Sequence, residues 1–417
     1  MKIVNAMCTP GLTGFYFDDQ KAIKQGALMD GFMYTGEPLT EKFSAIRQAG
    51  ESLLIMLVLE DGQVAYGDAA AVQYSGAGGR DPLFLAEEGA HFFNEHLKAR
   101  LIGLDVTQFK AHAEMFDTLI LDGKRLHTAM RYGLSSALLQ ATAKAHHLTI
   151  AEVVRQEYGM RKKTYEPVPI FAQTGDERYS NVDKMIIKEV DVMPHALINN
   201  IDTKLGREGE LLKEYVQWMR NRILDKRRRE DYQPILHIDV YGTIGIIFDN
   251  DLDAMYQYLK ELSSIAAPFA LRIEGPVDTG DRAGTMAALR DLRIRLDEDR
   301  DTHVEIVADE WCNTLEDVKY FTDHAAGHMI QVKTPDLGSV HNIIEALLYC
   351  RSHKMGAYSG GTCNETNISA EITTSIAIAC EARQCLAKPG MGADEGLMIV
   401  KNHMARELTL IKSRRSS

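Results

Sequence analysis

TYEPVPIFAQTGD, from Thr164 to Asp176, marks the point at which the pattern of the chain changes. From here on, short apolar runs alternate with amphipathic segments long enough for helices. The candidate strands are PIFAQ (169–173), KMIIKEV (184–190), PILHIDV (234–240), FALRIEG (269–275), HVEIVADE (303–310), HMIQVK (328–333) and KMGAYSG (354–360). Alternating strands and helices predict a parallel sheet.

Seven or eight such units in about 240 residues fit the α/β fold of a (β/α)8 TIM-type barrel. The helices between the strands include ELLKEYVQWMRNRILDK (210–226), DLDAMYQYLKELSSIA (251–266), MAALRDLRIRL (286–296), LEDVKYFTDHA (315–325) and LGSVHNIIEALLYCRSH (337–353). A doubly wound open sheet is the structural alternative, but the sequence lacks the glycine fingerprint that marks its switch point.

The residues before Thr164 indicate a separate α+β unit. Glu51–Ala70 reads as two strands joined at Asp61-Gly62, which is a hairpin signal. Helical patterns follow at 83–101 and 134–158, after a glycine-rich loop, AVQYSGAGGRDP (71–82), that has neither dinucleotide-binding nor Walker spacing. We therefore expect an N-terminal α+β domain over 1–163 and a barrel domain over 164–417.

The composition excludes some classes of function. The chain has 417 residues, is 45% hydrophobic and carries a formal net charge of -12, which argues against sequence-independent binding to nucleic acid or to an anionic membrane. No stretch reaches the roughly 18 apolar residues of a membrane span. The six cysteines form no CxxC pair, so we expect reduced thiols and a cytoplasmic location.

Three successive predicted strands end in acids. Asp239 ends LHID, Glu274 ends LRIE, and Asp309 follows EIVA. In a barrel these side chains would point into the mouth, where catalytic groups sit. Carboxylate oxygens with open water positions favour Mg²⁺, or Mn²⁺, over Zn²⁺. The alternative is that each acid caps a helix or pairs with an arginine such as Arg272.

Lys333 ends the next strand on the same face as Met329 and Gln331, whereas Ile330 and Val332 face the other way. We interpret it as a base facing the metal, which requires its pKa to fall from about 10.4 to about 7 to 8. Burial and a nearby dication both lower an amine pKa. The alternatives are a lysine tail that reaches solvent and a Schiff-base lysine.

Other polar groups cluster in the same plane. Gln173 ends PIFAQ, and His195 follows the second predicted strand in DVMPH. SGGTCNET (359–366) opens a helix expected to begin near Asn364, and its N–H groups with the Thr362 hydroxyl would suit a carboxylate. Cys363 has no base partner in the sequence, so we do not interpret it as a nucleophile.

Together LHIDVYG, LRIEGP, VADEWCNT, MIQVKTPDLG and SGGTCNET resemble the enolase superfamily and, within it, the methylaspartate ammonia-lyase family. The resemblance covers the whole chain, including the 71–82 loop. Many superfamily members carry a lysine pair at the end of the second barrel strand. His195 stands beyond that strand here, which points away from racemases and toward the ammonia-lyases.

The resemblance implies a homodimer, a capping domain over the barrel, Mg²⁺ and a monovalent activator such as K⁺. It implies reversible anti-elimination of ammonia from L-threo-3-methylaspartate to mesaconate through a metal-stabilised aci-carboxylate, in anaerobic glutamate breakdown. Lys333 would take the C3 proton of the (2S,3S) substrate, and His195 would serve the other C3 epimer. His195 and Gln331 would add hydrogen bonds to the carboxylate beside C3. Gln73, Gln173, Thr362 and Cys363 would hold the second carboxylate and the amine.

Three other interpretations stay open. A different enolase-type lyase, such as a dehydratase or cycloisomerase acting on another carboxylate, would share the strand-end acids. A Schiff-base aldolase would use Lys333 without a metal. A barrel that serves only in binding or structure would need neither the strand-end acids nor Lys333, and the presence of these residues argues against it.

Overall fold

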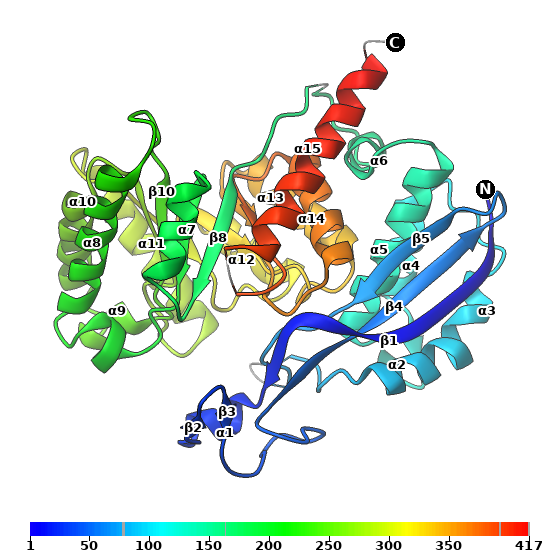
Figure 1. The fold of residues 1–417 in the computed structure, drawn as a ribbon, viewed down its shortest axis with the longest axis horizontal. Coiled ribbons are helices and arrows are strands. Elements are labelled where there is room, and N and C mark those ends of the chain that lie inside the picture. Colours follow the sequence, from blue (N-terminus) through cyan, green and yellow to red (C-terminus); the bar gives the residue numbers. More distant parts are fainter. Residues whose placement is uncertain (77–79, 163, 392, 416–417) are drawn as a thin grey trace.

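The structure is a computed structural model that describes residues 1–76, 80–162, 164–391 and 393–415. The part of the glycine-rich loop at 77–79 lies outside the described residues. Figure 1 shows the N-terminal elements in blue and cyan beside the barrel, which runs from green to red. None of the described helices is long and apolar enough to cross a membrane. The six cysteines are free thiols, as expected.

Eight parallel strands close into a barrel in the order β10-β11-β12-β13-β14-β15-β8-β9, so the open-sheet alternative is wrong. The strands are β8 Ile170–Gly175, β9 Val192–Ala196, β10 Ile235–Asp239, β11 Leu271–Glu274, β12 Val304–Ala308, β13 Met329–Val332, β14 Gly356–Ser359 and β15 Cys385–Leu386. Met329 packs inside the barrel, and Ile330 and Val332 pack under the helices, as strand alternation predicts.

Helices surround the barrel in the expected alternation. They are α7 Ser180–Ile187, a π-helix Ile201–Leu205, α8 Glu210–Lys226, α9 Thr243–Ile247, α10 Leu252–Ala266, α11 Arg282–Glu298, α12 Leu315–Asp323, α13 Val340–Ser352, α14 Asn367–Cys380 and α15 Glu395–Arg415. In α8, for example, Leu212, Tyr215, Val216, Met219 and Ile223 are buried, the helical spacing of one apolar face. The five helices predicted between the barrel strands are confirmed.

The predicted second strand, KMIIKEV, is wrong: most of it belongs to helix α7. Val182, Met185 and Ile186 are buried at helical spacing, whereas Ile187 is 61% exposed. A run of only three apolar residues fits both the two-residue period of a strand and the 3.6-residue period of a helix, and the structure shows a helix here. The second strand is β9, and the eighth, β15, has only two residues and was not predicted.

The N-terminal domain is built on the antiparallel sheet β1-β4-β5. Its elements are β1 Ile3–Asp18, α1 Gln20–Lys24, β2 Met29–Asp30, β3 Met33–Tyr34, β4 Arg47–Leu59, β5 Val64–Ala69, α2 Ala86–Phe92, a π-helix Phe93–Leu97, α3 Lys98–Leu101, α4 Phe109–Asp117, β6 Ile120–Leu121, β7 Lys124–Arg125, α5 Thr128–Ala145 and α6 Ile150–Glu157. The hairpin predicted at Asp61-Gly62 is confirmed, and Gly62 takes the positive φ of +86° that its turn needs.

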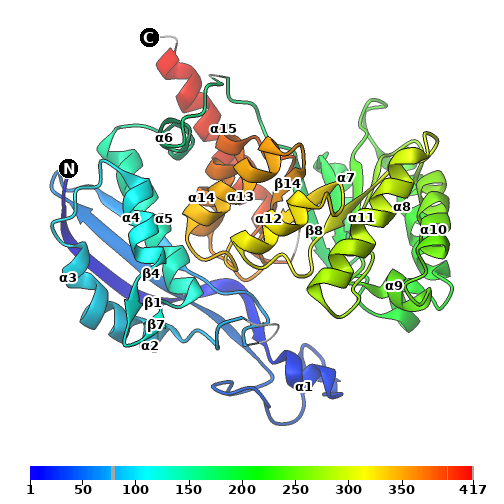
Figure 2. The same cartoon turned by 180° about the vertical axis from the view of Figure 1, so that it is seen from behind.

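Helix α5 connects the two halves. It packs on β5 on one side and against α13 and α14 of the barrel on the other, as Figure 2 also shows. The approach to β5 is close because glycines face each other. A Cβ on Gly133 would lie 2.4 Å from the backbone nitrogen of Ala69, and one on Gly67 would lie 2.2 Å from the carbonyl oxygen of Gly133.

We expect Gly133→Ala to lower the free energy of unfolding by about 1–3 kcal/mol, because backbone atoms cannot move aside as a side chain can. The measurement is thermal and denaturant unfolding of the purified protein. Gly89→Ala is the matched control, since its added methyl would meet side chains and no backbone of a neighbouring segment: the Phe84 ring at 2.8 Å and Leu53 Cδ2 at 3.6 Å. Equal stability of the two variants would contradict the close α5–β5 packing.

Candidate active site

The carboxylates predicted at the strand ends meet at the mouth of the barrel. Asp239 and Glu274 are the last residues of β10 and β11 and pair in register, and Asp309 follows β12 directly. All three are buried. Their neighbours Ile238, Ile273, Ile306 and Ala308 pack under the helices, which confirms the predicted division of faces.

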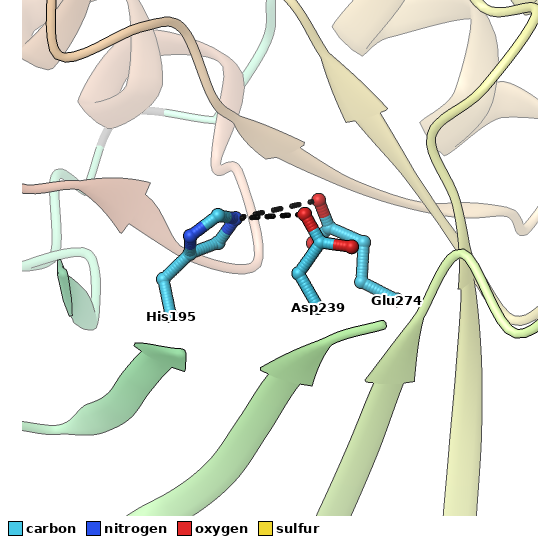
Figure 3. A group of neighbouring side chains, drawn as sticks. All are labelled: His195, Asp239 and Glu274. Atoms are coloured by element: carbon cyan, nitrogen blue, oxygen red, sulfur yellow. Dashed lines mark ion pairs between the residues drawn. The ribbon is translucent and has the colours of Figure 1, made fainter. Parts of the chain in front are cut away.

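His195 lies inside β9, not beyond the second strand as predicted. Its Nε2 atom is 3.3 Å from Asp239 Oδ2 and 3.8 Å from Glu274 Oε1, and Figure 3 shows the three side chains pointing toward one another. Ligand atoms of these three residues lie within 4.8 Å of one another, close enough to hold a metal ion. Burial alone lowers the His195 pKa, but the two carboxylates outweigh it and raise that pKa to about 10.

The Glu274 carboxylate is fixed from within the barrel. His237 Nε2 lies 2.7 Å from Oε2, Gln331 Nε2 donates to Oε1 at 2.7 Å, and the Tyr358 hydroxyl donates to Oε2 at 2.8 Å. Burial raises the Glu274 pKa, yet hydrogen bonds from His195 and His237 reverse this and hold it below its usual range. Sequence reasoning missed the roles of His237 and Tyr358, although strand alternation places His237 on the face of Asp239.

Lys333 and Asp309 form an ion pair, with Nζ 3.0 Å from Oδ1, and both are buried. The Nζ atom also donates to Asn313 Oδ1 at 3.3 Å. Burial lowers the Lys333 pKa, but Asp309 and Glu310 outweigh it, so the pKa lies above its ordinary value. The lowering expected from the sequence therefore does not arise from the protein groups alone.

The donor chemistry fits a divalent cation. Burial, together with repulsion from Glu274, raises the pKa of Asp239 to about 6. Burial, together with repulsion from Glu274 and Asp239, also raises the pKa of Asp309 to about 6. The buried Asp309 Oδ1 atom makes no hydrogen bond, since its contact with Lys333 lacks the geometry of one. A crowded group of buried oxygens with an unsatisfied member suits a hard cation. The predicted set Asp239, Glu274 and Asp309 shares two members with the His195 cluster.

Lys333 and His195 come from opposite sides of the mouth. In the closed order of eight strands, β9 and β13 are four strands apart, and the acid-bearing strands β10, β11 and β12 lie between them. Two titratable nitrogens therefore flank the carboxylates from opposing directions. Such an arrangement suits a pair of proton-transfer groups that act from opposite sides of one bound molecule.

The other predicted site residues divide between two regions. Gln73, which follows β5, accepts a hydrogen bond from Cys363 Sγ at 3.6 Å, so the N-terminal domain reaches the β14–α14 loop. The Thr362 hydroxyl accepts from the Asn364 N–H at 3.2 Å. Gln173 pairs in register with His195 and donates to the Ala387 carbonyl at 3.0 Å.

Two details of the β14–α14 loop differ from prediction or extend it. Helix α14 begins at Asn367 and not near Asn364, because the Thr366 side chain caps it. The Thr362 N–H donates to Glu365 Oε1 at 3.2 Å, so it is already engaged within the protein. Burial raises the Cys363 pKa to about 12, in agreement with the expectation that this thiol is no nucleophile.

Comparison with known proteins gives matches over the whole chain. The family descriptions "Methylaspartate ammonia-lyase N-terminus" and "Methylaspartate ammonia-lyase C-terminus" match residues 1–159 and 162–413. Methylaspartate ammonia-lyase of Clostridium tetanomorphum is 61% identical over 415 residues, which is 100% of both chains.

Solved structures agree with the sequence matches. The Mg-complex of β-methylaspartase from Clostridium tetanomorphum superposes with a TM-score of 0.97 at 62% identity, covering 99% of this chain and 100% of that chain. The Citrobacter amalonaticus methylaspartate ammonia-lyase containing (2S,3S)-3-methylaspartic acid has a TM-score of 0.97 at 54% identity, with the same coverage.

A muconate lactonizing enzyme from Pseudomonas fluorescens shares the fold alone. Its TM-score is 0.60 at 16% identity, over 92% of this chain and 87% of that chain. The enolase-superfamily resemblance thus holds at the level of the fold. The full-length matches at higher identity carry the closer assignment. The chain belongs to the methylaspartate ammonia-lyase family of carbon–nitrogen lyases.

Proposed function

We propose that this chain removes ammonia reversibly from L-threo-3-methylaspartate, giving mesaconate. The observation that carries the proposal is the buried Lys333 amine, 3.0 Å from Asp309 beside two more strand-end carboxylates, in a member of this family. The C3–H bond breaks and its proton passes to Lys333 Nζ. The electron pair of the C3–H bond forms the C2–C3 double bond, and the C2–N bond breaks with its electron pair leaving on the nitrogen of ammonia.

Asp239, Glu274 and Asp309 would hold Mg²⁺, with Mn²⁺ as a substitute. The Mg-complex of the Clostridium relative supports the choice of metal. When bound, the cation would offset the negative charge that develops on the carboxylate beside C3 and would lower the pKa of Lys333. A monovalent activator such as K⁺ is part of the proposal by resemblance to the family.

Lys333 would act as the base for the (2S,3S) substrate, and His195 would be the base for the other C3 epimer. Their places on β9 and at the end of β13, on opposite sides of the acid-bearing strands, support this division. The relative from Citrobacter contains the (2S,3S) isomer in its structure. His195 would also bind the substrate, because its Nε2 lies beside Asp239 and Glu274, which we propose as metal ligands.

Five further residues would hold the substrate. Gln331 would donate to the carboxylate beside C3 by turning one of the N–H bonds that now meet Glu274 Oε1 at 2.7 Å and the Tyr358 hydroxyl at 2.6 Å. The second carboxylate and the amine of the substrate would be bound by Gln73, Gln173, Thr362 and Cys363. The contact between Gln73 and Cys363 supports a role for the N-terminal domain, because it brings both halves of the chain to the same place.

The proposal extends to organisation and partners. We propose a capping domain over 1–163, a barrel domain over 164–417 and a homodimer, with a small amino-dicarboxylate as the binding partner. The two family matches, which end at 159 and begin at 162, support the division. The net charge of -12 supports the absence of nucleic-acid and anionic-membrane partners.

The direct test mixes the protein with Mg²⁺, K⁺ and (2S,3S)-3-methylaspartate. We expect ultraviolet absorbance from the unsaturated diacid to rise together with free ammonium, in equal amounts. An unsaturated acid formed without ammonium from a hydroxy acid, with 3-methylaspartate left unchanged, would indicate a dehydratase or another enolase-type lyase. Absence of both products would contradict the proposal.

Lys333→Ala should lower kcat for the (2S,3S) isomer by about 10²–10⁴-fold, the range that a general base contributes. Mg²⁺ binding, followed by isothermal calorimetry, should stay intact because the variant keeps all three carboxylates. The exposed Lys401→Ala is the control. A loss of metal affinity equal to the loss of turnover would show that Lys333 is structural.

Asp239→Asn should weaken Mg²⁺ binding by at least about 10-fold, the lower end of what changes around metal ligands cause. An amide carries no charge and is a poorer ligand for a hard cation. Asp323→Asn is the control, since that carboxylate accepts from Tyr349 on the surface. An unchanged calorimetric titration would remove Asp239 from the ligand set.

A further inference from the structure

A fully buried ion pair joins Glu365 to Lys388, and none of the roles assigned above uses it. Glu365 stands in the β14–α14 loop, and Lys388 follows β15 by two residues. Both side chains have 0% exposure, and Lys388 Nζ lies 2.9 Å from Glu365 Oε1. The same amine donates to Thr334 Oγ1 at 2.8 Å and to the Gly360 carbonyl at 2.7 Å. Each of its three N–H bonds therefore has an acceptor.

Glu365 is equally well satisfied. Its Oε1 atom accepts from the Thr334 hydroxyl at 2.8 Å and from the Thr362 N–H at 3.2 Å, besides Lys388. Its Oε2 atom accepts from the Tyr132 hydroxyl at 2.7 Å. Tyr132 belongs to helix α5 of the N-terminal domain, so one carboxylate joins four segments of the chain.

The pair lies directly behind groups assigned to the reaction. Thr334 is the neighbour of Lys333 in the chain, and Thr362 is a proposed substrate-binding residue. The β14–α14 loop packs on the two charges, because a Cβ on Gly361 would lie 2.3 Å from Glu365 Oε1 and 2.5 Å from Lys388 Nζ. The Glu365 carbonyl also accepts from the Gly14 N–H of β1 at 2.7 Å.

We propose that the Glu365–Lys388 pair positions Lys333 and the Thr362 loop relative to each other and to the N-terminal domain. Glu365 and Lys388 are positioning residues, because they act through Thr334, Thr362 and Tyr132. This inference rests on the function proposed above. It adds two residues to the machinery that neither the strand pattern nor the metal cluster indicates.

Stability and positioning can be separated at such a pair. Removing one partner leaves an unpaired buried charge and is strongly destabilising, whereas replacing both with neutral side chains of similar volume often leaves stability unchanged. The charge-assisted hydrogen bonds, however, fix the geometry more tightly than neutral packing does. A double variant in which both side chains are neutral therefore tests the positioning role without the loss of stability that an unpaired buried charge would cause.

The first experiment compares Glu365→Gln/Lys388→Met with the parent chain in Mg²⁺ and K⁺. We expect a similar unfolding temperature and unchanged Mg²⁺ affinity, because the metal ligands lie on β10, β11 and β12. For (2S,3S)-3-methylaspartate, kcat/KM should fall about 10- to 100-fold, up to the loss that a 1 Å misplacement causes.

Three outcomes would overturn the proposal. A folded double variant with the parent's kcat and KM would show that the pair has no positioning role. An equal loss of Mg²⁺ affinity would show that the change spreads through the barrel. An equal loss of stability and turnover, both restored by a stabilising salt, would show a structural role only. If the parent itself has no turnover, the proposed function fails, and that result is distinct from all three.

A milder pair of variants decides the question should the double variant not fold. Thr334→Val removes the hydroxyl that joins Lys388 to Glu365, and Thr334→Ser keeps it. We expect kcat to fall about 10-fold in the first and to be restored in the second, at equal unfolding temperature. Thr142→Val is the matched control, because its buried hydroxyl donates only to the Leu138 carbonyl in α5. Equal kcat for Val and Ser at 334, or an equal loss at 142, would contradict the proposal.

Discussion

Repulsion among carboxylates is the constraint on which the site depends. Asp239, Glu274 and Asp309 are buried together at the ends of adjacent strands. Two like charges about 4 Å apart repel by about 4 kcal/mol at an effective dielectric of about 20. Burial adds to this cost, and the raised pKa values of Asp239 and Asp309 reflect both. Folding tolerates such a group only because positive charge and hydrogen-bond donors face it, and the same need for positive charge is why we propose that the group binds a cation.

The barrel meets this constraint by geometry. Closure brings the carboxyl ends of all eight strands to one ring, and the parallel register of β10 and β11 sets Asp239 opposite Glu274. Inside the ring, His237, Gln331 and Tyr358 hold the Glu274 carboxylate and leave little freedom for rotation. Rigid strands therefore carry the charged groups, as preorganised electrostatic catalysis requires.

Much of this arrangement can be predicted from the sequence, because a strand that is buried on both faces appears there as a short apolar run. The acids after apolar runs, the alternation in β13 and the helical faces of α8 are local patterns. No local pattern marks the strand β9, the two-residue strand β15 or the place of His195, because contacts with distant parts of the chain determine them. The same holds for Glu365 and Lys388, whose side-chain partners other than Thr362 lie 23 to 233 residues away in the chain. A buried lysine in an AKPG segment has no local signature that separates it from a surface lysine.

The two halves of the chain meet at the site and not merely beside it. Gln73 contacts Cys363, Tyr132 donates to Glu365, and Arg80 pairs with Asp336 at 3.0 Å. Each of these barrel residues stands in a loop that follows β13 or β14. The barrel strands hold the buried charged groups, whereas these loops are where the barrel contacts the N-terminal domain. Specificity arises from differences in contacts to the substrate. In the function proposed above, proton transfer and substrate selection therefore belong to different parts of the chain, which the buried Glu365–Lys388 pair joins.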